Sequence, residues 1–448
     1  MSESERLDRT KRIDPKLRAQ GRLGYFWRDL CLLLLLVMET TVVSFRLAQQ
    51  VPSALVKSSG TDVWFEGNPW RTAGIMSNRL HPEAYVTDRH PLFPLLTFPA
   101  VRVAEIMLHI KPVVATHLLI AIIAGLWVGT LFVLLRLTGC RRLDAMMFSL
   151  LATTSAAAVF WFTVPETYSL GSWTILLALL LLALARYHRV PSWGYFAVNV
   201  MTLSVTVTNW MAAILVTFAR RPWRQALGIT VSAFLAVSLL WNVEKVGFPY
   251  ATSFLNQHRA THYFFQQESG GPLRIVASFV FHSMVMPHIE REPLSPQDQK
   301  LSKMSVQHSP LWSGSLLSVI ATGLWVVLLG VGVWGAVRDE QNRPFVQVLG
   351  LTLLGQLVLH LVYGGEETFL YSLHWLPLLV ILAAFGTRTR IRGLIVVLAG
   401  ALIVCGGINN GVQFERAVQF VRSHRMDEST GPMDRLLRSG WLGTPQAN

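Results

Sequence analysis

The amino-acid sequence predicts an all-α polytopic membrane protein, and three observations support this. First, 52% of the 448 residues are hydrophobic and only 15% are charged, whereas about 25% of the residues in soluble domains are charged. Second, the later part of the chain holds four uncharged segments, at 311–337, 345–365, 368–387 and 393–414. As helices they are long enough to cross a hydrocarbon core of about 30 Å. Third, clusters of Arg and Lys flank the apolar segments, as they do in cytoplasmic loops.

The predicted elements follow the apolar segments in order. A basic cytoplasmic arm, residues 1–24, precedes a transmembrane domain over 25–411 and an extracytoplasmic tail over 412–448. About eleven spans are expected, since roughly 20 apolar residues make one crossing. They are 25–47, 118–135, 146–164, 170–185, the two halves of 193–219, 225–243, 311–337, 345–363, 368–386 and 393–409.

One of these segments, 193–219, has basic clusters at both of its ends. Because positive charge collects on the cytoplasmic side, both ends are expected there, and the segment is predicted to form two short helices that meet near Thr208 and Asn209. Such broken helices occur at membrane depth only where protein or a cavity surrounds them. Beyond the last span, Phe414 and Val418 recur at helical spacing, which indicates a further helical stretch.

Two long polar segments, 49–112 and 244–310, are predicted to be extracytoplasmic loops. Each includes a shorter apolar piece, 93–110 in the first and 273–286 in the second, that is expected to lie along the membrane surface as a helix. Polar loops of this length between spans usually have a function of their own. The chemistry of the protein is therefore expected outside the cytoplasm.

The net charge of +13 is explained by the basic clusters that flank the apolar segments. We therefore expect no nucleic-acid partner, and we expect the protein to contact membrane lipid. Three cysteines, Cys31, Cys140 and Cys405, give neither a disulfide framework nor a metal-binding CxxC spacing. Glu39 lies inside the first predicted span. An ionisable group there is expensive and should face a cavity or a partner.

The first loop carries the candidate chemistry. Asp62 and Glu66 are four residues apart, so on a helical turn they would share one face. Such carboxylates could serve as a general base, help to hold a divalent cation, or be a solvated acidic pair. The loop also has several basic side chains that suit a phosphate or lipid headgroups, namely Arg71, Arg79, Arg89 and His90.

This loop resembles the first loop of the GT-C superfamily of membrane glycosyltransferases. The matching features are an early acidic residue, Asp62, and a closing element, His90-Pro91-Leu92-Phe93. Further matches follow in the same order: Pro165-Glu166-Thr167-Tyr168 after the third span, the bent pair near Thr208-Asn209, and Glu366-Glu367-Thr368-Phe369-Leu370-Tyr371 followed by His374 and Pro377. The acidic residues Asp62 and Glu66 are not adjacent, as a pair in the family commonly is, and no DxD motif is present, which leaves metal use open.

The resemblance implies an enzyme that moves a hexosyl or pentosyl group from a polyprenyl-phosphate carrier to an extracytoplasmic acceptor, which is a cell-envelope glycan, lipid or protein. It implies a place in the bacterial cytoplasmic (inner) membrane, with the N-terminus in the cytoplasm. The catalytic carboxylates would be Asp62, Glu66 and Glu166, with Asp62 the first choice as base. The residues implied in binding substrate and phosphate are Arg71, Arg89, His90, Glu367, Tyr371 and His374.

Two other classes of protein share these sequence features. A transporter or lipid flippase would also have many spans, a broken helix pair and a membrane-embedded Glu. A scaffold of an envelope-assembly complex would need no site at all. Acidic residues of separate loops that converge on one outward cavity would favour the enzyme, and a polar site at the membrane midplane would favour transport.

Overall fold

The computed structural model describes residues 15–57, 63–256, 264–265, 267–295 and 298–423 of the chain. Within these residues, seven helices are long and apolar enough to cross a membrane. They are α2 (Pro15–Ala48), α6 (Pro112–Leu137), α9 (Thr167–Leu184), α12 (Trp223–Gly247), α14 (Leu316–Arg338), α15 (Arg343–Val362, preceded by η6, Glu340–Asn342) and α17 (Arg392–Ser423). The helical membrane-protein class predicted from the sequence is thus confirmed.

An eighth crossing is made if a bent segment counts as one span. It consists of η7 (Thr368–His374) and the run of α16 (Leu376–Ala384) and η8 (Phe385–Arg388), which meet at 55°. Leu376 and Pro377 occupy the first turn of α16. A proline is tolerated there because the first amide groups of a helix have no partner within it.

The three other expected spans are too short to cross alone, so the structure does not confirm a count of eleven. Residues 146–164 are divided between α7 (Arg142–Thr153) and α8 (Ala156–Trp161). Residues 193–219 form α10 (Ser192–Val205) and α11 (Trp210–Arg220), separated by the short η2 (Val207–Asn209). The predicted bend near Thr208 and Asn209 is confirmed. Arg221 donates to the carbonyl of Val190, which brings the two outer ends of this hairpin together.

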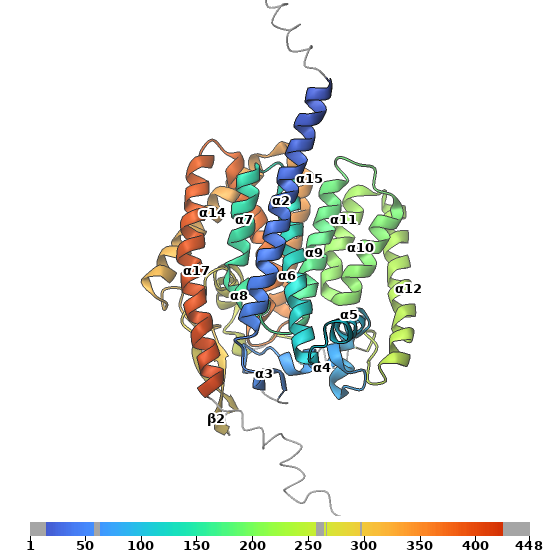
Figure 1. The fold of residues 1–448 in the computed structure, drawn as a ribbon, viewed down its shortest axis with the longest axis vertical. Coiled ribbons are helices and arrows are strands. Elements are labelled where there is room, and N and C mark those ends of the chain that lie inside the picture. The colour runs from blue at the N-terminus through green and yellow to red at the C-terminus, as the bar shows by residue number, and fades with distance from the viewer. Residues whose placement is uncertain (1–14, 58–62, 257–263, 266, 296–297, 424–448) are drawn as a thin grey trace, which may run out of the picture.

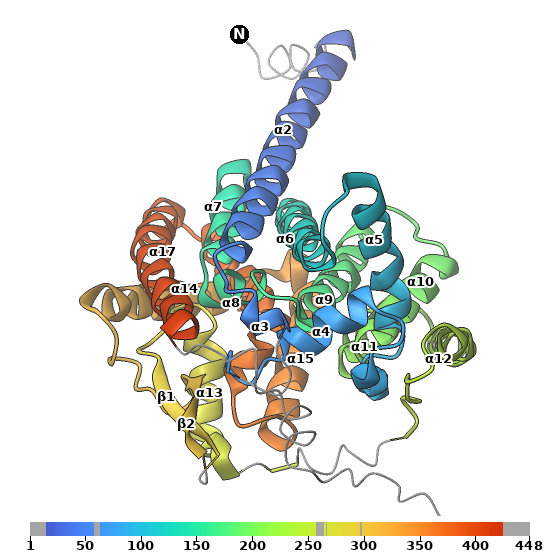
Figure 2. The same ribbon diagram turned by 60° about the horizontal axis from the view of Figure 1, so that its bottom comes forward.

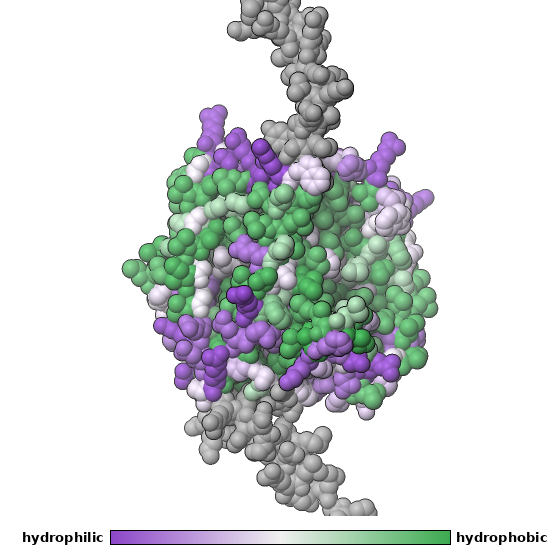
Figure 3. Space-filling view, in the orientation of Figure 1, coloured by the Kyte–Doolittle hydropathy of each residue, from purple (hydrophilic) through white to green (hydrophobic). Residues whose placement is uncertain are grey.

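One end of the bundle is basic. Arg136 lies 3.0 Å from the Asp29 carboxylate and Arg392 lies 2.6 Å from that of Asp144, which ties α2 to α6 and α7 to α17. The long loops meet at the opposite end, where the ribbon shows α3, α4 and the hairpin strand β2 (Figure 1). A hydrophobic belt separates polar residues at the two ends (Figure 3). This is the surface that a bilayer requires.

The first loop covers its end of the bundle with four short helices: α3 (Ala54–Lys57), α4 (Pro69–Ser77), η1 (Pro82–Asp88) and α5 (Phe93–Leu108). α5 lies across the direction of α6 (Figures 1 and 2). Its outward face is apolar, with Val103, Ile106 and Met107 exposed by 60%, 62% and 73%. The helix expected over 93–110 is present, and its place along the membrane surface stays a prediction, for which such an apolar face would be required.

The second loop differs from the all-α prediction. It contains an antiparallel hairpin of β1 (Glu290–Ser295) and β2 (Asp298–Ser305). The apolar piece at 273–286 becomes α13 (Pro272–Ala277) and the π-helical turn η5 (Ser278–His282). The amide of Met304 donates to the carbonyl of Val63 at 2.9 Å. β2 is thereby attached to the first loop.

α17 continues through the expected boundary at 411 to Ser423. Phe414, Val418 and Val421 lie on its buried side, as their helical spacing indicated. The last helix therefore extends well past the segment predicted to span the membrane. It reaches the hairpin at the loop-bearing end of the bundle (Figure 2).

Candidate functional site

Glu66 is presented by a tight turn. The amide of Gly67 donates to the carbonyl of Trp64 at 2.8 Å, and Phe65 and Glu66 both have positive φ angles, 49° and 60°. Two left-handed residues at the centre of a turn usually require Gly or Asn. Here Phe65 is fully buried against Phe160 and Phe369, and this packing holds the turn. The expectation that Glu66 sits on a helical turn is therefore wrong, and Asp62 lies outside the described residues.

The Glu66 carboxylate is held from two sides and remains partly open. The amide of Glu367 donates to its Oε2 at 2.9 Å, and Lys303 Nζ lies 3.4 Å from its Oε1. Lys303 also pairs with Glu366. The Glu66 side chain keeps 18% of its surface exposed. Burial raises the pKa of Glu66 to about 7, although Lys303 acts in the opposite direction.

Glu166 has a different environment. It is the N-cap residue of α9, is fully buried, and accepts from the amide of Asn68 at 2.5 Å and from Thr72 Oγ1 at 3.3 Å. Burial raises its pKa, and the charge of Arg71 opposes that effect. With both oxygens occupied by the protein, Glu166 joins the first loop to α9. It orients the Glu66 turn, which is only two residues from Asn68.

Glu367 is buried on the other side of Glu66. Its Oε2 accepts from Ser305 Oγ at 2.9 Å and from the amide of Val306 at 3.0 Å, while no described residue donates to its Oε1. Burial raises the pKa of Glu367 to about 8. This carboxyl fixes the end of β2 against the segment that enters η7.

A cavity of about 290 Å³ is lined in part by Tyr168 of α9 and by Tyr371 and His374 of η7, the two helices that Glu166 and Glu367 cap. Its walls combine cationic, aromatic and aliphatic side chains: Asp88, Arg89, His90, Tyr168, Thr206, Val207, Thr208, Phe264, Leu359, His360, Val362, Tyr363, Tyr371 and His374. A second cavity of about 280 Å³ shares His360, Val362 and Tyr363 with it and extends to Gly365. A Cβ atom on Gly365 would lie 2.5 Å from Glu66 Oε2. Glu66 thus stands against the wall of the second cavity.

His90 is a neutral member of the first cavity. Its Nδ1 lies 2.9 Å from the carbonyl of Val205, and its Nε2 lies 3.3 Å from Thr167 Oγ1. Burial lowers the pKa of His90 to about 3, and the charge of Arg89 acts in the same direction. The carbonyl of Val205 can only accept, so Nδ1 carries the proton and Nε2 accepts from the hydroxyl.

Tyr371 and His374 come to this cavity from η7. The Tyr371 ring lies 4.7 Å from the His360 ring and 5.2 Å from the Tyr168 ring, measured between centroids. His374 packs 5.6 Å from Tyr168. The buried Nε2 atoms of His360 and His374 have no hydrogen-bond partner within the part of the chain that the structure describes. Buried polar atoms of this kind usually have a partner, protein or water, so they are available to a bound molecule.

The structure brings most of the expected site residues together at the loop-bearing end. Arg89, His90, Tyr371 and His374 line the first cavity. Glu66 lies in the turn of residues 64–67. Glu166 accepts from the amide of Asn68, which follows this turn, and the amide of Glu367 donates to Glu66. Arg71 lies behind them, where burial disfavours its charge but Glu166 raises its pKa.

Sequence reasoning missed Lys303, the cation nearest to Glu66. His360, which lines both cavities, was not among the expected site residues either. Lys303 lies in a polar loop segment that gave no signal, since its position depends on the hairpin β1–β2.

Two further expectations concern a cation and Glu39. Across the described residues, no three His, Cys, Asp or Glu side chains form a group that could hold a metal ion; a cation site that includes Asp62 stays open. Glu39 lines a groove of about 550 Å³ between α2, α7, α8 and α17, together with Glu415. It therefore faces a groove, as an ionisable group in a span should.

Comparisons of the chain with models of protein families, with characterised proteins and with solved structures find no significant match.

Proposed function

We propose that this protein is a membrane glycosyltransferase that moves a sugar from a polyprenyl-phosphate carrier to an acceptor hydroxyl on the extracytoplasmic side. The observation that carries the proposal is Glu66. It is a partly exposed carboxylate with a pKa raised to about 7. It lies beside Gly365, which lines the second cavity, and that cavity shares His360, Val362 and Tyr363 with the first, where Arg89 supplies a cation. A group with this pKa is well suited to accept a proton near neutral pH.

The reaction assigns one task to each part of the site. Glu66 accepts the proton of the acceptor hydroxyl as its oxygen bonds to the anomeric carbon of the sugar. The bond between that carbon and the phosphate oxygen breaks, and its electron pair stays with the phosphate. The lipid phosphate leaves as an anion, whose developing charge a fixed guanidinium stabilises.

Arg89 is the residue that we assign to the phosphate. Its side chain is 26% exposed and lines the 290 Å³ cavity. Leu359 and Val362 line the same cavity and would contact the first isoprene units. A guanidinium offers forked donors to phosphate oxygens, whereas the neutral His90 adds no charge.

The orientation follows from the charge distribution. The basic end, with Arg136, Arg142 and Arg392, is assigned to the cytoplasm by the positive-inside rule, together with the N-terminus. The carboxylates then lie outside, where acceptors of the cell envelope are found, and the membrane would be a bacterial cytoplasmic membrane. A transporter would instead place its polar site near the midplane, whereas Glu66, Glu166 and Glu367 gather at one end.

The test uses purified protein in lipid nanodiscs with radiolabelled polyprenyl-phosphate sugars, and follows release of the free carrier. Glu66→Gln should lower the rate by about 10²–10⁴, the usual contribution of a positioned base. Glu340→Gln, an exposed carboxylate at the basic end, is the matched control and should retain full activity. In active wild-type protein, kcat/KM should rise with pH through about 7, because only the deprotonated Glu66 can act as base.

Two other outcomes would change the proposal. A fully active Glu66→Gln protein combined with an inactive Asp62→Asn protein would move the base to Asp62. Loss of activity with a chelator would show that a divalent cation takes part. No release from any carrier, with wild-type protein that remains folded, would contradict the glycosyltransferase assignment.

A further inference from the structure

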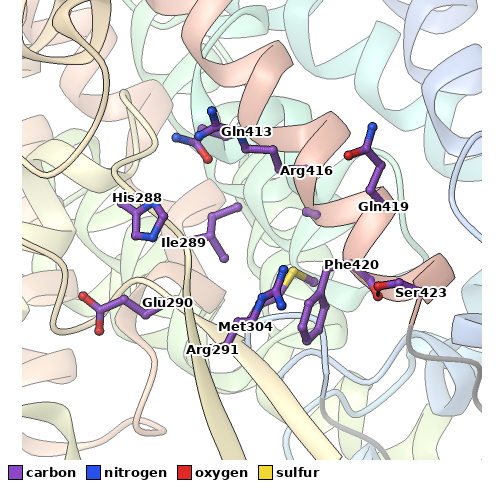
Figure 4. Close-up of a pocket in the computed structure, with 11 residues that line it drawn as sticks. His288, Ile289, Glu290, Arg291, Met304, Gln413, Arg416, Gln419, Phe420 and Ser423 are labelled. Carbon is purple, nitrogen blue, oxygen red and sulfur yellow. Dashed lines mark hydrogen bonds between the residues drawn. The ribbon is translucent and has the colours of Figure 1, made fainter.

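A cavity of about 770 Å³ lies between the β-hairpin and the last turns of α17. Gln413, Arg416 and Gln419 come from α17, with His288, Glu290 and Arg291 around β1 on the other side (Figure 4). None of these residues belongs to the site around Glu66. The volume lies in the range of about 300–1,000 Å³ that is typical of pockets for small organic ligands.

Gln413 is the first sign of a ligand. This residue is only 2% exposed, yet its Oε1 has no hydrogen-bond partner among the described residues. Leaving a buried polar atom unpaired costs about 1–3 kcal/mol, and most such atoms in proteins are paired. A glutamine in this position is explained if a bound molecule completes its hydrogen bonds.

The surrounding side chains define the chemistry of that molecule. Arg416 is exposed and makes no hydrogen bond or ion pair with any described residue, so it offers donors only. The Glu290 carboxylate accepts from Ser309 at 3.1 Å and still has an oxygen to accept a second bond. An amide needs both a donor and an acceptor. Hydroxyl groups can bond to Arg416, to Glu290 and to the Gln413 amide, since each hydroxyl can both donate and accept.

An anionic ligand fits less well. An anionic phosphodiester only accepts hydrogen bonds, so it cannot donate to Gln413 Oε1 or to Glu290, and the Glu290 charge repels it. One guanidinium is also occupied in part, because Arg291 lies over the Phe420 ring, 4.9 Å from its centroid. The groove is therefore matched to a neutral polyhydroxylated molecule.

We propose that this groove binds a carbohydrate chain, and that, if the proposed glycosyltransferase activity is correct, this chain is the body of the acceptor. β2 connects the two places. Met304 lines the groove, while the preceding Lys303 contacts Glu66. Successive side chains of a strand point to opposite faces, so the groove and Glu66 lie on opposite sides of one strand. A glycan held in the groove would have to pass an edge of β2 for its growing end to reach the base.

The experiment measures binding without turnover. Full-length protein in nanodiscs is titrated with maltoheptaose, chitohexaose and a linear arabinofuranosyl hexamer, each up to about 10 mM, which exceeds the ~1 mM expected of weak single-site binding. Saturation-transfer NMR reports the bound sugar. At least one oligosaccharide should bind, and Gln413→Leu and Arg416→Ala should each weaken its binding about tenfold, equal to ~1.4 kcal/mol. Arg422→Ala, on the same helix but outside the groove, is the matched control.

The Glu66→Gln protein separates this inference from the proposed activity. It should bind the oligosaccharide as the wild type does, although it transfers sugar about 10²–10⁴ times more slowly. Glycan binding that depends on Gln413 and Arg416, in a wild-type protein that releases no carrier, would support the groove and contradict the glycosyltransferase assignment. Three results would overturn the inference: no binding of any of the three oligosaccharides, binding that Gln413→Leu and Arg416→Ala leave unchanged, or binding of inorganic phosphate in place of sugar.

Discussion

The position of Glu66 depends on a backbone that its own residue type disfavours. A non-glycine residue in the left-handed region costs of order 1–3 kcal/mol, and such residues gather at functional sites. Here two stand side by side, Phe65 and Glu66. The aromatic packing of Phe65 against Phe160 and Phe369 opposes this strain, so that Glu66 points at Gly365 and Lys303.

Gly365 tests how closely Glu66 must be placed. In Gly365→Ala, the new Cβ would come within 2.5 Å of Glu66 Oε2, so the carboxylate must move. We expect transfer to fall by at least about tenfold, an effect of the size that small misplacements of a catalytic group produce, while the apparent Tm changes little. Gly364→Ala is the neighbouring control, since the nearest atom to its new Cβ is 3.5 Å away. Equal activity of the two variants would contradict this role for Gly365.

Glu367 predicts how stability depends on pH. Its pKa is raised from 4.5 to about 8, so between these values the folded protein keeps a proton that the unfolded chain releases. Stability from this group is therefore full below about pH 4.5 and declines as the pH rises to about 8, by up to ~1.4 kcal/mol for each pH unit. Thermal unfolding of Glu367→Gln should show a smaller loss of Tm between pH 5 and 8 than the wild type. Parallel curves would refute the assignment.

At the scale of elements, α17 supports the break between α7 and α8. Asn410 donates to the carbonyls of Thr154 and Met284 at 2.8 Å and 2.9 Å, and accepts from the amide of Met286 at 2.9 Å. Backbone groups at such a break have no water to bond in a membrane. One side chain on α17 thus completes hydrogen bonds of two other segments.

Asn410→Leu should therefore be strongly destabilising. It leaves two backbone groups without partners, the Thr154 carbonyl and the Met286 amide, each at a cost of about 1–3 kcal/mol. The Met284 carbonyl still accepts from the amide of Ala156 at 3.0 Å. We expect a clear fall in the apparent Tm of detergent-solubilised protein, seen by intrinsic tryptophan fluorescence. Val404→Leu, on the exposed side of the same helix, should leave the Tm unchanged. A neutral Asn410→Leu would mean that water or relaxation satisfies these groups.

Elements of this kind mark the limit of prediction from sequence. Length and hydropathy identified the long helices, because burial in lipid requires only apolar composition over some 20 residues. The basic clusters at both ends of segment 193–219 also located the bend near Thr208. Hydropathy could not find the break at Thr154, which depends on Asn410 more than 250 residues away. The hairpin was missed because Lys303 and its neighbours show no regular alternation.

The sequence predicted several residues of the candidate site, but not how the fold arranges them. Arg89, His90, Tyr371 and His374 were selected by motif and line one cavity. The turn of Phe65 and Glu66 could not be foreseen, since neither residue type favours a positive φ. The sequence also does not reveal that Glu166 is buried and Glu66 is partly exposed, and this difference decides which of the two carboxylates could act as the base.

For the whole molecule, the assignment of sides can be tested directly. Leu80 and His188 are exposed at opposite ends of the bundle. In a protein whose three native cysteines are replaced, Leu80→Cys should react with an impermeant maleimide added to intact cells, and His188→Cys only after permeabilisation. Reaction of both from the same side would overturn the topology, and the reverse pattern would invert it.

The short hairpin of α10 and α11 has a consequence for the surrounding bilayer. α10 has 14 residues, which at 1.5 Å per residue extend about 21 Å, less than a hydrocarbon core of about 30 Å. The tip is bound to the first loop, where the amide of Val207 donates to the carbonyl of Arg89 at 3.1 Å. The neighbouring α12 has 25 residues, enough for a full hydrocarbon core. If lipid reaches Arg89 beside the short hairpin without burying its charge, the membrane there has to be thinner, at a cost of a fraction of a kcal/mol per ångström. Lipid headgroups would then lie closer to the cavity, and the protein would favour membranes with shorter acyl chains.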